Sequence, residues 1–265
     1  MKPALVFPFN DPDGTMFSLL QAIMPDLKGH FDRGYISVPK ATQERQPGNV
    51  RLLEQNAFFR LFMISSEAPV GDHFAFLYHQ AATMAHPEQI LHLCFPDRLS
   101  FALRTEYRER FLADIDVLTE EHLPLIFHRS ESAWATHPKN YFELESFVTR
   151  IGQILFGKTL DYGWCHLVIQ ATQLKEIMPL IKRHDISMVA EMVLHAQADV
   201  KTREVDWLAW EDPFILGRDA GELKQERENS LAETRKRLAY VLPMVEMLTK
   251  FAMKGKEVAD VGNFE

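Results

Sequence analysis

The sequence has few cysteines, no long apolar run and no excess of positive charge. Its two cysteines, Cys94 and Cys165, stand in apolar surroundings, which favours buried free thiols in a reducing compartment over a disulfide. No apolar stretch approaches the roughly 20 residues that a membrane helix requires. The formal net charge of −8 argues against a general nucleic-acid or anionic-membrane surface. The first residues do not resemble a signal peptide, so we expect a cytoplasmic protein with no nucleic-acid partner and no integral membrane segment.

The common phosphate-binding and catalytic signatures are also missing. There is no Walker-type loop, no G-x-G-x-x-G after the first apolar run, no G-x-S-x-G, no C-x-x-C and no H-E-x-x-H. These absences argue against the simplest nucleotidase, Rossmann dehydrogenase, α/β-hydrolase and zinc-protease interpretations. They do not exclude a sugar-nucleotide enzyme, because a divalent cation on carboxylates can hold the diphosphate in such an enzyme.

The start of the chain has the pattern of a buried strand that ends abruptly. The apolar run 4–7 is followed by Pro8-Phe9-Asn10-Asp11, and an unbroken apolar run is typical of a strand with helices on both faces. The next apolar segment predicts a helix over 15–24 that ends before Pro25. A strand, a polar turn and a helix begin an open α/β sheet, and the turn is expected to line a ligand crevice beyond the strand.

Strands and helices then alternate, which predicts an α/β fold with parallel strands and right-handed crossovers. We expect strands at 32–39, 62–64, 89–95, 123–127, 166–169 and 204–210, a loop at 43–49, and helices at 50–59, 73–84, 105–118, 141–156, 173–182 and 186–197. After Gly217 a charged helix is expected over 219–254, interrupted at Pro243. We therefore divide the chain into a domain over 1–217 and a C-terminal helical appendage and tail over 218–265.

The expected C-terminal helix carries apolar residues seven positions apart at Leu231, Leu238 and Val245. A stripe of this kind either packs on its own domain or pairs with a second chain. The stripe is short and contains Pro243, which favours packing on the domain. A homodimer through the C-terminal helix is the alternative.

Asp97 stands at the end of the most apolar predicted central strand, in Leu93-Cys94-Phe95-Pro96-Asp97. A carboxylate at that place would point into the crevice and could hold Mg²⁺ or Mn²⁺, which prefer oxygen ligands. Proline and aspartate are also common turn residues. The spacing alone favours a turn over a metal ligand.

The succession of motifs resembles the GT-A type glycosyltransferases, and most closely mannosylglycerate synthase and its relatives. The resemblance covers roughly residues 4 to 250 and depends on four segments in order: Leu5-Val6-Phe7-Pro8-Phe9, Gly71-Asp72, His92-Leu93-Cys94-Phe95-Pro96-Asp97 and Tyr162-Gly163-Trp164. It implies a GT-A-like fold, with a mixed, mainly parallel sheet flanked by helices and a C-terminal helical appendage.

By this resemblance, the function is retaining transfer of a sugar from a nucleotide-sugar donor to a small acceptor, assisted by Mg²⁺ or Mn²⁺. The resemblance places the nucleotide sugar at residues that come from three segments, namely Pro8, Phe9, Asn10, Asp11, Gly71, Asp72 and Trp164. It assigns Asp97 to the metal and to catalysis.

The chain also departs from the family pattern. Phe95 stands where the first acid of an Asp-x-Asp motif is expected, and the late metal-binding histidine of the family has no counterpart. Asp212, in Glu211-Asp212-Pro213, could supply a carboxylate instead. The alternative function is therefore a catalytically degenerate GT-A-like protein that binds a ligand or partner.

The remaining candidates each have a structural alternative. Glu191 lies in an otherwise apolar helix, where related enzymes place an acid that faces the sugar or the acceptor, but it could equally reach solvent at a helix edge. Trp164 could stack on a sugar or pack in the core. Arg98 and Lys40 could contact phosphates or remain solvated surface charges.

Overall fold

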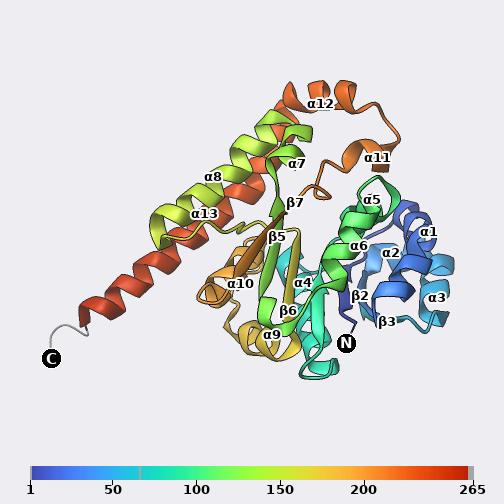
Figure 1. The fold of residues 1–265 in the computed structure, drawn as a ribbon, viewed down its shortest axis with the longest axis horizontal. Helices are drawn as coiled ribbons and strands as arrows, with labels where there is room; N and C mark the ends of the chain where they lie inside the picture. Colours follow the sequence, from blue (N-terminus) through green and yellow to red (C-terminus); the bar gives the residue numbers. More distant parts are fainter. Residues whose placement is uncertain (1, 66, 262–265) are drawn as a thin grey trace.

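A seven-stranded sheet forms the centre of the molecule (Figure 1). In this computed structural model, which describes residues 2–65 and 67–261, the strand order is β3-β2-β1-β4-β6-β5-β7. The strands are β1 (Ala4–Pro8), β2 (Gly34–Pro39), β3 (Phe59–Ile64), β4 (Ile90–Leu93), β5 (Leu125–Arg129), β6 (His166–Gln170) and β7 (Lys201–Val205).

Only β6 runs against its neighbours in this sheet. It pairs antiparallel with β4 and β5, whereas the other paired strands are parallel. The register places Leu93, the last residue of β4, opposite Leu167 near the start of β6. The loop that leads into β6 therefore lies at the same sheet edge as the carboxyl ends of the other strands.

Helices cover both faces of the sheet (Figure 1). The helices are α1 (Thr15–His30), α2 (Lys40–Arg45), α3 (Pro47–Gln55), α4 (Val70–Met84), α5 (Pro96–Arg104), α6 (Arg108–Asp116), α7 (Glu131–Thr136), α8 (Lys139–Phe156), α9 (Ala171–Ile177), α10 (Met188–Ala196), α11 (Asp212–Leu216), α12 (Ala220–Glu228) and α13 (Leu231–Val261), with short 3₁₀ turns at Glu120–His122 and Met178–Leu180. One core cluster joins the sheet to α4, α9, α10 and α13, and the other joins it to α1, α5 and α6.

This architecture confirms the predicted α/β fold with a mixed, mainly parallel sheet and a long C-terminal helix. Buried aliphatic runs such as β1, in which every residue is buried, form the central strands because both faces are covered. No helix within the described ranges is long and apolar enough to cross a bilayer.

Prolines account for several errors in the predicted helices. The first helix does not end at Pro25 but continues to His30, because Ile23 and Leu27 on either side of the proline are both buried in the core. The predicted loop at 43–49 is wrong, since Pro47 occupies the first turn of α3, a position where the missing N–H costs nothing. Pro96 begins α5 in the same way, and that helix was not predicted.

Two further boundaries differ from the prediction. The helix predicted over 73–84 begins earlier, because α4 starts at Val70 and Asp72 lies in its first turn. The strand predicted over 204–210 is displaced: β7 covers Lys201–Val205, and Trp207 packs in the core from the turn that follows.

The C-terminal helix packs on the body of the protein, against α8 and α10. It passes through Pro243 without a break. Val241, Met244 and Leu248 are buried, whereas Leu231 is 65% exposed. The predicted seven-residue stripe is therefore wrong in phase, although the expected packing on the chain's own body is observed. Residues 262–265 of the predicted tail lie outside the described residues.

A pair of histidines lies in the middle of the core. His92 Nε2 and His166 Nδ1 are 2.8 Å apart, both side chains are fully buried, and the rings of Phe111, Phe127 and Trp207 lie around them. Burial lowers the pKa of His92 to about 3. It also lowers the pKa of His166 well below the ordinary value, and His92 adds to this effect. Both rings are therefore neutral and share one N–H between them.

These depressed pKa values predict that acid destabilises the fold. Below the ordinary histidine pKa of about 6.5, these two histidines become protonated in the unfolded chain but stay neutral in the folded protein. The free energy of unfolding should therefore fall with decreasing pH between about 6.5 and 3. The expected slope is roughly 1.4 kcal/mol per pH unit for each such group. Urea titrations at several pH values would measure the slope. It should be shallower in His166→Gln and unchanged in the control His79→Gln, whose side chain is exposed; equal slopes in all three proteins would contradict the assignment.

Candidate functional site

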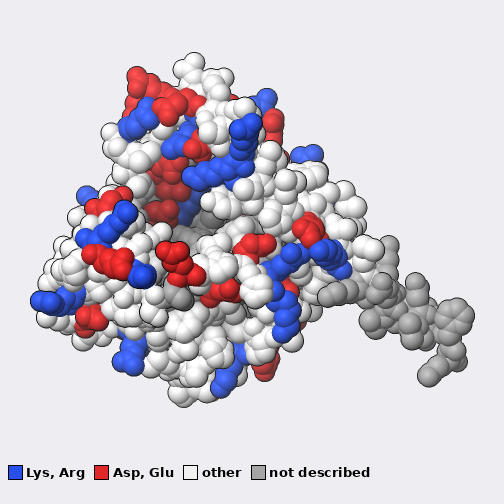
Figure 2. Space-filling view, turned by 180° about the vertical axis from the view of Figure 1, so that it is seen from behind, with Lys and Arg blue, Asp and Glu red and all other residues white. Residues whose placement is uncertain are grey.

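Two adjoining cavities lie along the sheet edge where the parallel strands end. The first, here called the β1–β3 cavity, has a volume of about 360 Å³ and is lined by residues that follow β1, β2 and β3, among them Asn10, Pro39, Lys40 and Ile64. The second, here called the arginine cavity, has a volume of about 290 Å³. It is lined by three arginines and two acids together with mainly apolar residues: Arg98, Arg129, Arg237, Glu145 and Asp161 are the charged ones. Val70, at the start of α4, lines both. Figure 2 shows a hollow in one face of the molecule with acidic and basic side chains around it.

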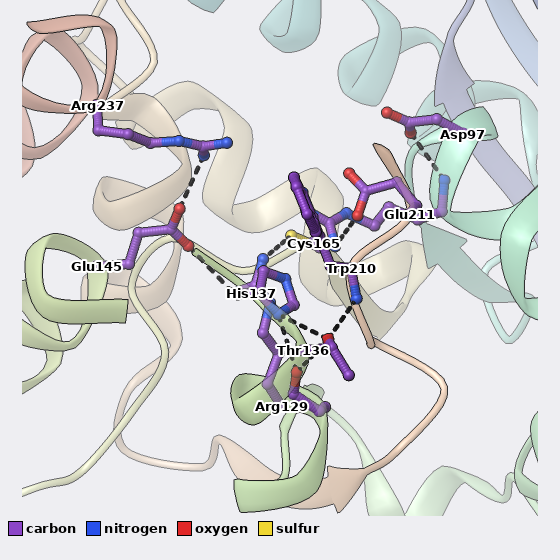
Figure 3. Close-up of polar contacts among 11 residues, drawn as sticks. Asp97, Arg129, Thr136, His137, Glu145, Cys165, Trp210, Glu211 and Arg237 are labelled. Atoms are coloured by element: carbon purple, nitrogen blue, oxygen red, sulfur yellow. Dashed lines mark hydrogen bonds and ion pairs between the residues drawn. The ribbon is translucent and has the colours of Figure 1, made fainter. Parts of the chain in front are cut away.

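Glu145 holds two of the three arginines. Its Oε2 accepts a hydrogen bond from Nη1 of Arg129 at 3.1 Å, and its Oε1 accepts one from Nη1 of Arg237 at 2.8 Å (Figure 3). Arg129 is the last residue of β5, Glu145 lies on α8 and Arg237 lies on α13. The Arg129 guanidinium also lies 4.4 Å from the centre of the Trp134 ring, and that of Arg237 lies 3.7 Å from the centre of the Tyr141 ring. Both groups are thus fixed by ion pairs and by aromatic faces.

The third arginine forms a buried ion pair. Arg98 Nη1 lies 2.5 Å from Glu211 Oε2, and the two side chains are 10% and 7% exposed. Burial raises the pKa of Glu211, while Arg98 acts in the opposite direction. Asp97 and Asp212 raise this pKa further. Asp97 directly precedes Arg98 and Asp212 directly follows Glu211, so the ion pair brings the two segments together.

The arginine cavity has hydrogen-bonding capacity to spare. Within the described part of the chain, Nη2 of Arg98 and Nη2 of Arg237 make no hydrogen bond to another residue, since Nη1 of each group forms the contact with its carboxylate. Arg98 and Arg129 are 8% and 5% exposed, and all three arginines line the cavity. Buried N–H donors without partners are costly, and a carboxylate or phosphate is the ligand whose geometry matches guanidinium groups. The arrangement is therefore suited to binding a small anion.

His137 lies beside this network and is neutral. Its Nδ1 donates to the carbonyl of Ala133 at 2.9 Å. Burial lowers the pKa of His137 well below its ordinary value, and the charges of Arg129 and Arg98 lower it further. The ring is 3% exposed and lines a separate shallow cavity beyond Arg129.

The residues predicted at the end of β1 divide into one that lines a cavity and three that do not. Asn10 is exposed and lines the β1–β3 cavity. Asp11 is 1% exposed, and its carboxylate accepts from the backbone N–H groups of Met16 and Phe17 at 3.0 and 2.8 Å. It therefore fixes the start of α1. Pro8 and Phe9 are buried, and Phe9 packs in the core beneath the turn.

Gly71 and Asp72 connect α4 to the loop before α10. A side-chain carbon at Gly71 would lie 2.4 Å from the carbonyl oxygen of Asp185, so only glycine allows this approach. Asp72 Oδ1 lies 2.6 Å from His184 Nδ1. Both residues shape the wall shared by the two cavities, and neither lines the arginine cavity.

Glu191 and Trp164 have structural contacts. Glu191 is 4% exposed, and its Oε2 accepts from the backbone N–H groups of Lys182 and Arg183 at 2.8 and 2.9 Å. It therefore fixes the loop that packs on Gly71. Trp164 is 1% exposed and donates its indole N–H to the carbonyl of Val189 at 3.0 Å. Neither side chain faces a cavity, so the roles that the family resemblance suggested for them are not supported by their positions.

Asp97 and Asp212 remain the candidates for a metal. Asp97 is half-buried and accepts the backbone N–H of Arg98 at 2.8 Å, a contact that suits the first turn of α5. Asp212 is the first residue of α11 and is also half-buried. No three potential ligands among histidine, cysteine, aspartate and glutamate converge within the described ranges. A cation here would have two carboxylates at most from the protein.

Sequence reasoning missed Arg129, Glu145 and Arg237, and it considered Glu211 only within the segment that contains Asp212. Arg129 is the last residue of β5 and lies just beyond the strand predicted over 123–127, at the carboxyl edge of the sheet where ligands bind. Glu145 and Arg237 are ordinary charged residues on amphipathic helices, and nothing in the sequence distinguishes them from solvated ones. Arg98 and Lys40, which were weighed as phosphate contacts, both line cavities.

Comparisons with known proteins found matches among solved structures. No family model matches the chain, and no curated protein does. Solved structures of glucosyl-3-phosphoglycerate synthase from Mycobacterium tuberculosis are similar. The complex with Mn²⁺, uridine diphosphate and phosphoglyceric acid has a TM-score of 0.49 at 11% identity, over 92% of this chain and 78% of that chain. The complex with Mn²⁺, uridine-diphosphate-glucose and phosphoglyceric acid has a TM-score of 0.49 at 10% identity, over 92% of this chain and 80% of that chain.

The Arg98–Glu211 pair should be strongly coupled to stability. Glu211→Ala leaves the Arg98 guanidinium buried without its partner and is expected to lower the free energy of unfolding by about 3–5 kcal/mol. Asp32→Ala is the control, because its pair with Arg33 is 41% and 53% exposed and should contribute no more than about 1 kcal/mol. Denaturant titrations of both variants measure the difference. Similar losses would show that Glu211 does not neutralise Arg98 in the folded protein.

Proposed function

We propose that the chain is a glycosyltransferase that moves a sugar from a nucleotide sugar in the β1–β3 cavity to a small anionic acceptor in the arginine cavity. One observation carries the proposal: two cavities of different character meet at Val70 along the carboxyl edge of the sheet. A transfer reaction requires two ligands side by side, and an open α/β sheet binds its ligands at this edge.

The β1–β3 cavity suits the donor. Asn10 offers an amide group that can both donate and accept, and His73 lines the same space. Lys40 offers a cation for phosphate, although its Nζ lies 3.7 Å from Glu44 Oε1, and Glu44 and Glu67 also line the cavity. His73 Nε2 lies 2.8 Å from the hydroxyl oxygen of Ser37, which fixes the ring. The cavity volume of about 360 Å³ lies at the lower end of the usual range for small-molecule sites, about 300–1,000 Å³.

The arginine cavity suits the acceptor. Three guanidinium groups pair with Glu145 and Glu211, and Nη2 of Arg98 and Arg237 is left without a partner among the described residues. Asp161 also lines the cavity, and burial raises the pKa of its carboxyl, which favours the uncharged form. An acid that enters would satisfy the Nη2 donors and would be oriented by them. The bond between the anomeric carbon and the diphosphate oxygen would break, and a hydroxyl oxygen of the acid would form the new bond to that carbon. The hydroxyl proton would pass to the departing diphosphate, and the anomeric configuration would be retained, as the resemblance to GT-A enzymes implies.

A divalent cation fits this scheme only if the nucleotide sugar supplies some of the ligands of the cation. Asp97 and Asp212 would hold Mg²⁺ or Mn²⁺, and phosphate oxygens and water would complete the shell, since these ions prefer oxygen ligands and Mg²⁺ retains several waters. When bound, the ion would neutralise charge on the leaving diphosphate. Arg98, which follows Asp97 directly, places a second positive charge in the same region.

A second function remains open: a GT-A-like protein that binds a ligand without transferring a sugar. Phe95 occupies the place of the first acid of the family motif, and no group of three metal ligands is found in the described residues. These two observations favour the binding protein. The free donors in the arginine cavity fit both functions.

Nucleotide sugars should stabilise the protein against heat. A ligand at about 100 times its dissociation constant adds roughly 2.7 kcal/mol, which raises the melting temperature of a chain of this size by several degrees, at about 2–4 °C per kcal/mol. Thermal melts with UDP-sugars and GDP-sugars, with Mg²⁺ and with Mn²⁺, measure the shift. Release of free nucleoside diphosphate after a small acid is added would separate the transferase from the binding protein. No shift with any of these donors would overturn the transferase.

Asp97→Asn tests the metal site. The change keeps the shape of the side chain and removes its charge, so folding should be nearly intact while metal-dependent nucleotide binding weakens. Loss of charge stabilisation in a transition state typically costs on the order of 10²–10³ in rate. Asp199→Asn is the control, because Asp199 is exposed and lines neither cavity. If the two variants are equally active, Asp97 is only a helix-start residue.

A further inference from the structure

The arginine cavity is charged at one end and apolar at the other. Arg237, Val241 and Met244 all line it from α13, and at 1.5 Å per residue the lining changes from charged to apolar over about 10 Å of helix. Glu145 and Val148 repeat the change on α8, where Glu145 contacts Arg237.

The apolar end is built from large side chains of several elements. Phe74 of α4 and Phe95, just after β4, lie with ring centres 5.8 Å apart, and Met244, Val241 and Ile186 complete the surface. None of these side chains can hydrogen-bond strongly to a hydroxyl. A small polyhydroxylated acid would lose hydrogen bonds to water there without replacement, whereas an apolar body would gain by covering the surface.

The size of the cavity is consistent with an aromatic ring. An engineered apolar cavity of about 150 Å³ accommodates benzene, and the arginine cavity has a volume of about 290 Å³. This leaves room for a ring, an anionic group and a hydroxyl. Aromatic side chains and methionine are good partners for such a ring.

From this polarity we infer that the acceptor is a hydroxylated aromatic carboxylic acid. Its carboxylate binds Nη2 of Arg98 and Nη2 of Arg237, and its ring lies against Phe74 and Met244. Its hydroxyl receives the sugar. The inference rests on the proposed function and narrows the class of acceptor.

Calorimetric titration of the full chain, without nucleotide sugar, tests the inference. The aromatic probe is 4-hydroxycinnamate, and the polar probes are glycerate and 3-phosphoglycerate at the same ionic strength. The aromatic acid is expected to bind at least tenfold more tightly than either polar acid. Equal or tighter binding of a polar acid, or no binding of the aromatic acid, would overturn the inference.

Two variants on α13 locate the binding site. Tyr240 lines the arginine cavity and is 38% exposed, so Tyr240→Ser should fold and should weaken binding of 4-hydroxycinnamate several-fold. Leu242→Ser is the matched control, because Leu242 is 59% exposed on the same helix and does not line the cavity. Equal affinities in the two variants would place the aromatic acid elsewhere and overturn the inference.

The outcome can be separated from that of the proposed function. Binding of 4-hydroxycinnamate, with no melting shift and no turnover for any nucleotide sugar, would support the aromatic-acid site and refute the transferase. Turnover of a nucleotide sugar on a polar acid, with no binding of the aromatic acid, would support the transferase and refute the aromatic acceptor.

Discussion

The double ion pair of Glu145 is the interaction on which the arginine cavity depends. One carboxylate on α8 binds a guanidinium from the end of β5 and another from α13. Without it, two arginines, one of them only 5% exposed, would face each other in a region with little water. Because a buried charge without a partner is strongly destabilising, the position of Glu145 determines whether the sheet edge and the two longest helices can meet around an open space.

The same contacts make the cavity rigid. Arg129 and Arg237 are each held by an aromatic face as well as by Glu145, and Arg98 is held by Glu211. A ligand that enters would therefore find its donors already oriented, and little side-chain entropy would be lost on binding. On the other side of Val70, Glu191 fixes the loop that packs on Gly71. A residue first considered for catalysis thus stabilises the wall shared by the two cavities.

Much of the fold was accessible from the sequence, because buried strands have continuous apolar runs and helices have apolar periodicity. The errors at Pro25 and Pro243 arise because core packing on both sides of each proline outweighs the lost backbone hydrogen bond. The candidate site was less accessible. Asp11 and Glu191 are acids in apolar surroundings, and the sequence cannot distinguish a carboxylate that binds a ligand from one that binds backbone N–H groups. Arg129, Glu145 and Arg237 are far apart in the chain, and only the tertiary fold brings them together.

The position of α13 links the arginine cavity to the order in which the chain is made. Every strand of the sheet precedes this helix in the sequence, yet Arg237 and Met244 of α13 form part of the cavity. Since chains are synthesised from the N-terminus and their early parts can begin to fold first, the sheet and the β1–β3 cavity can exist on the ribosome before the arginine cavity does. The two cavities would thus be completed at different stages of synthesis.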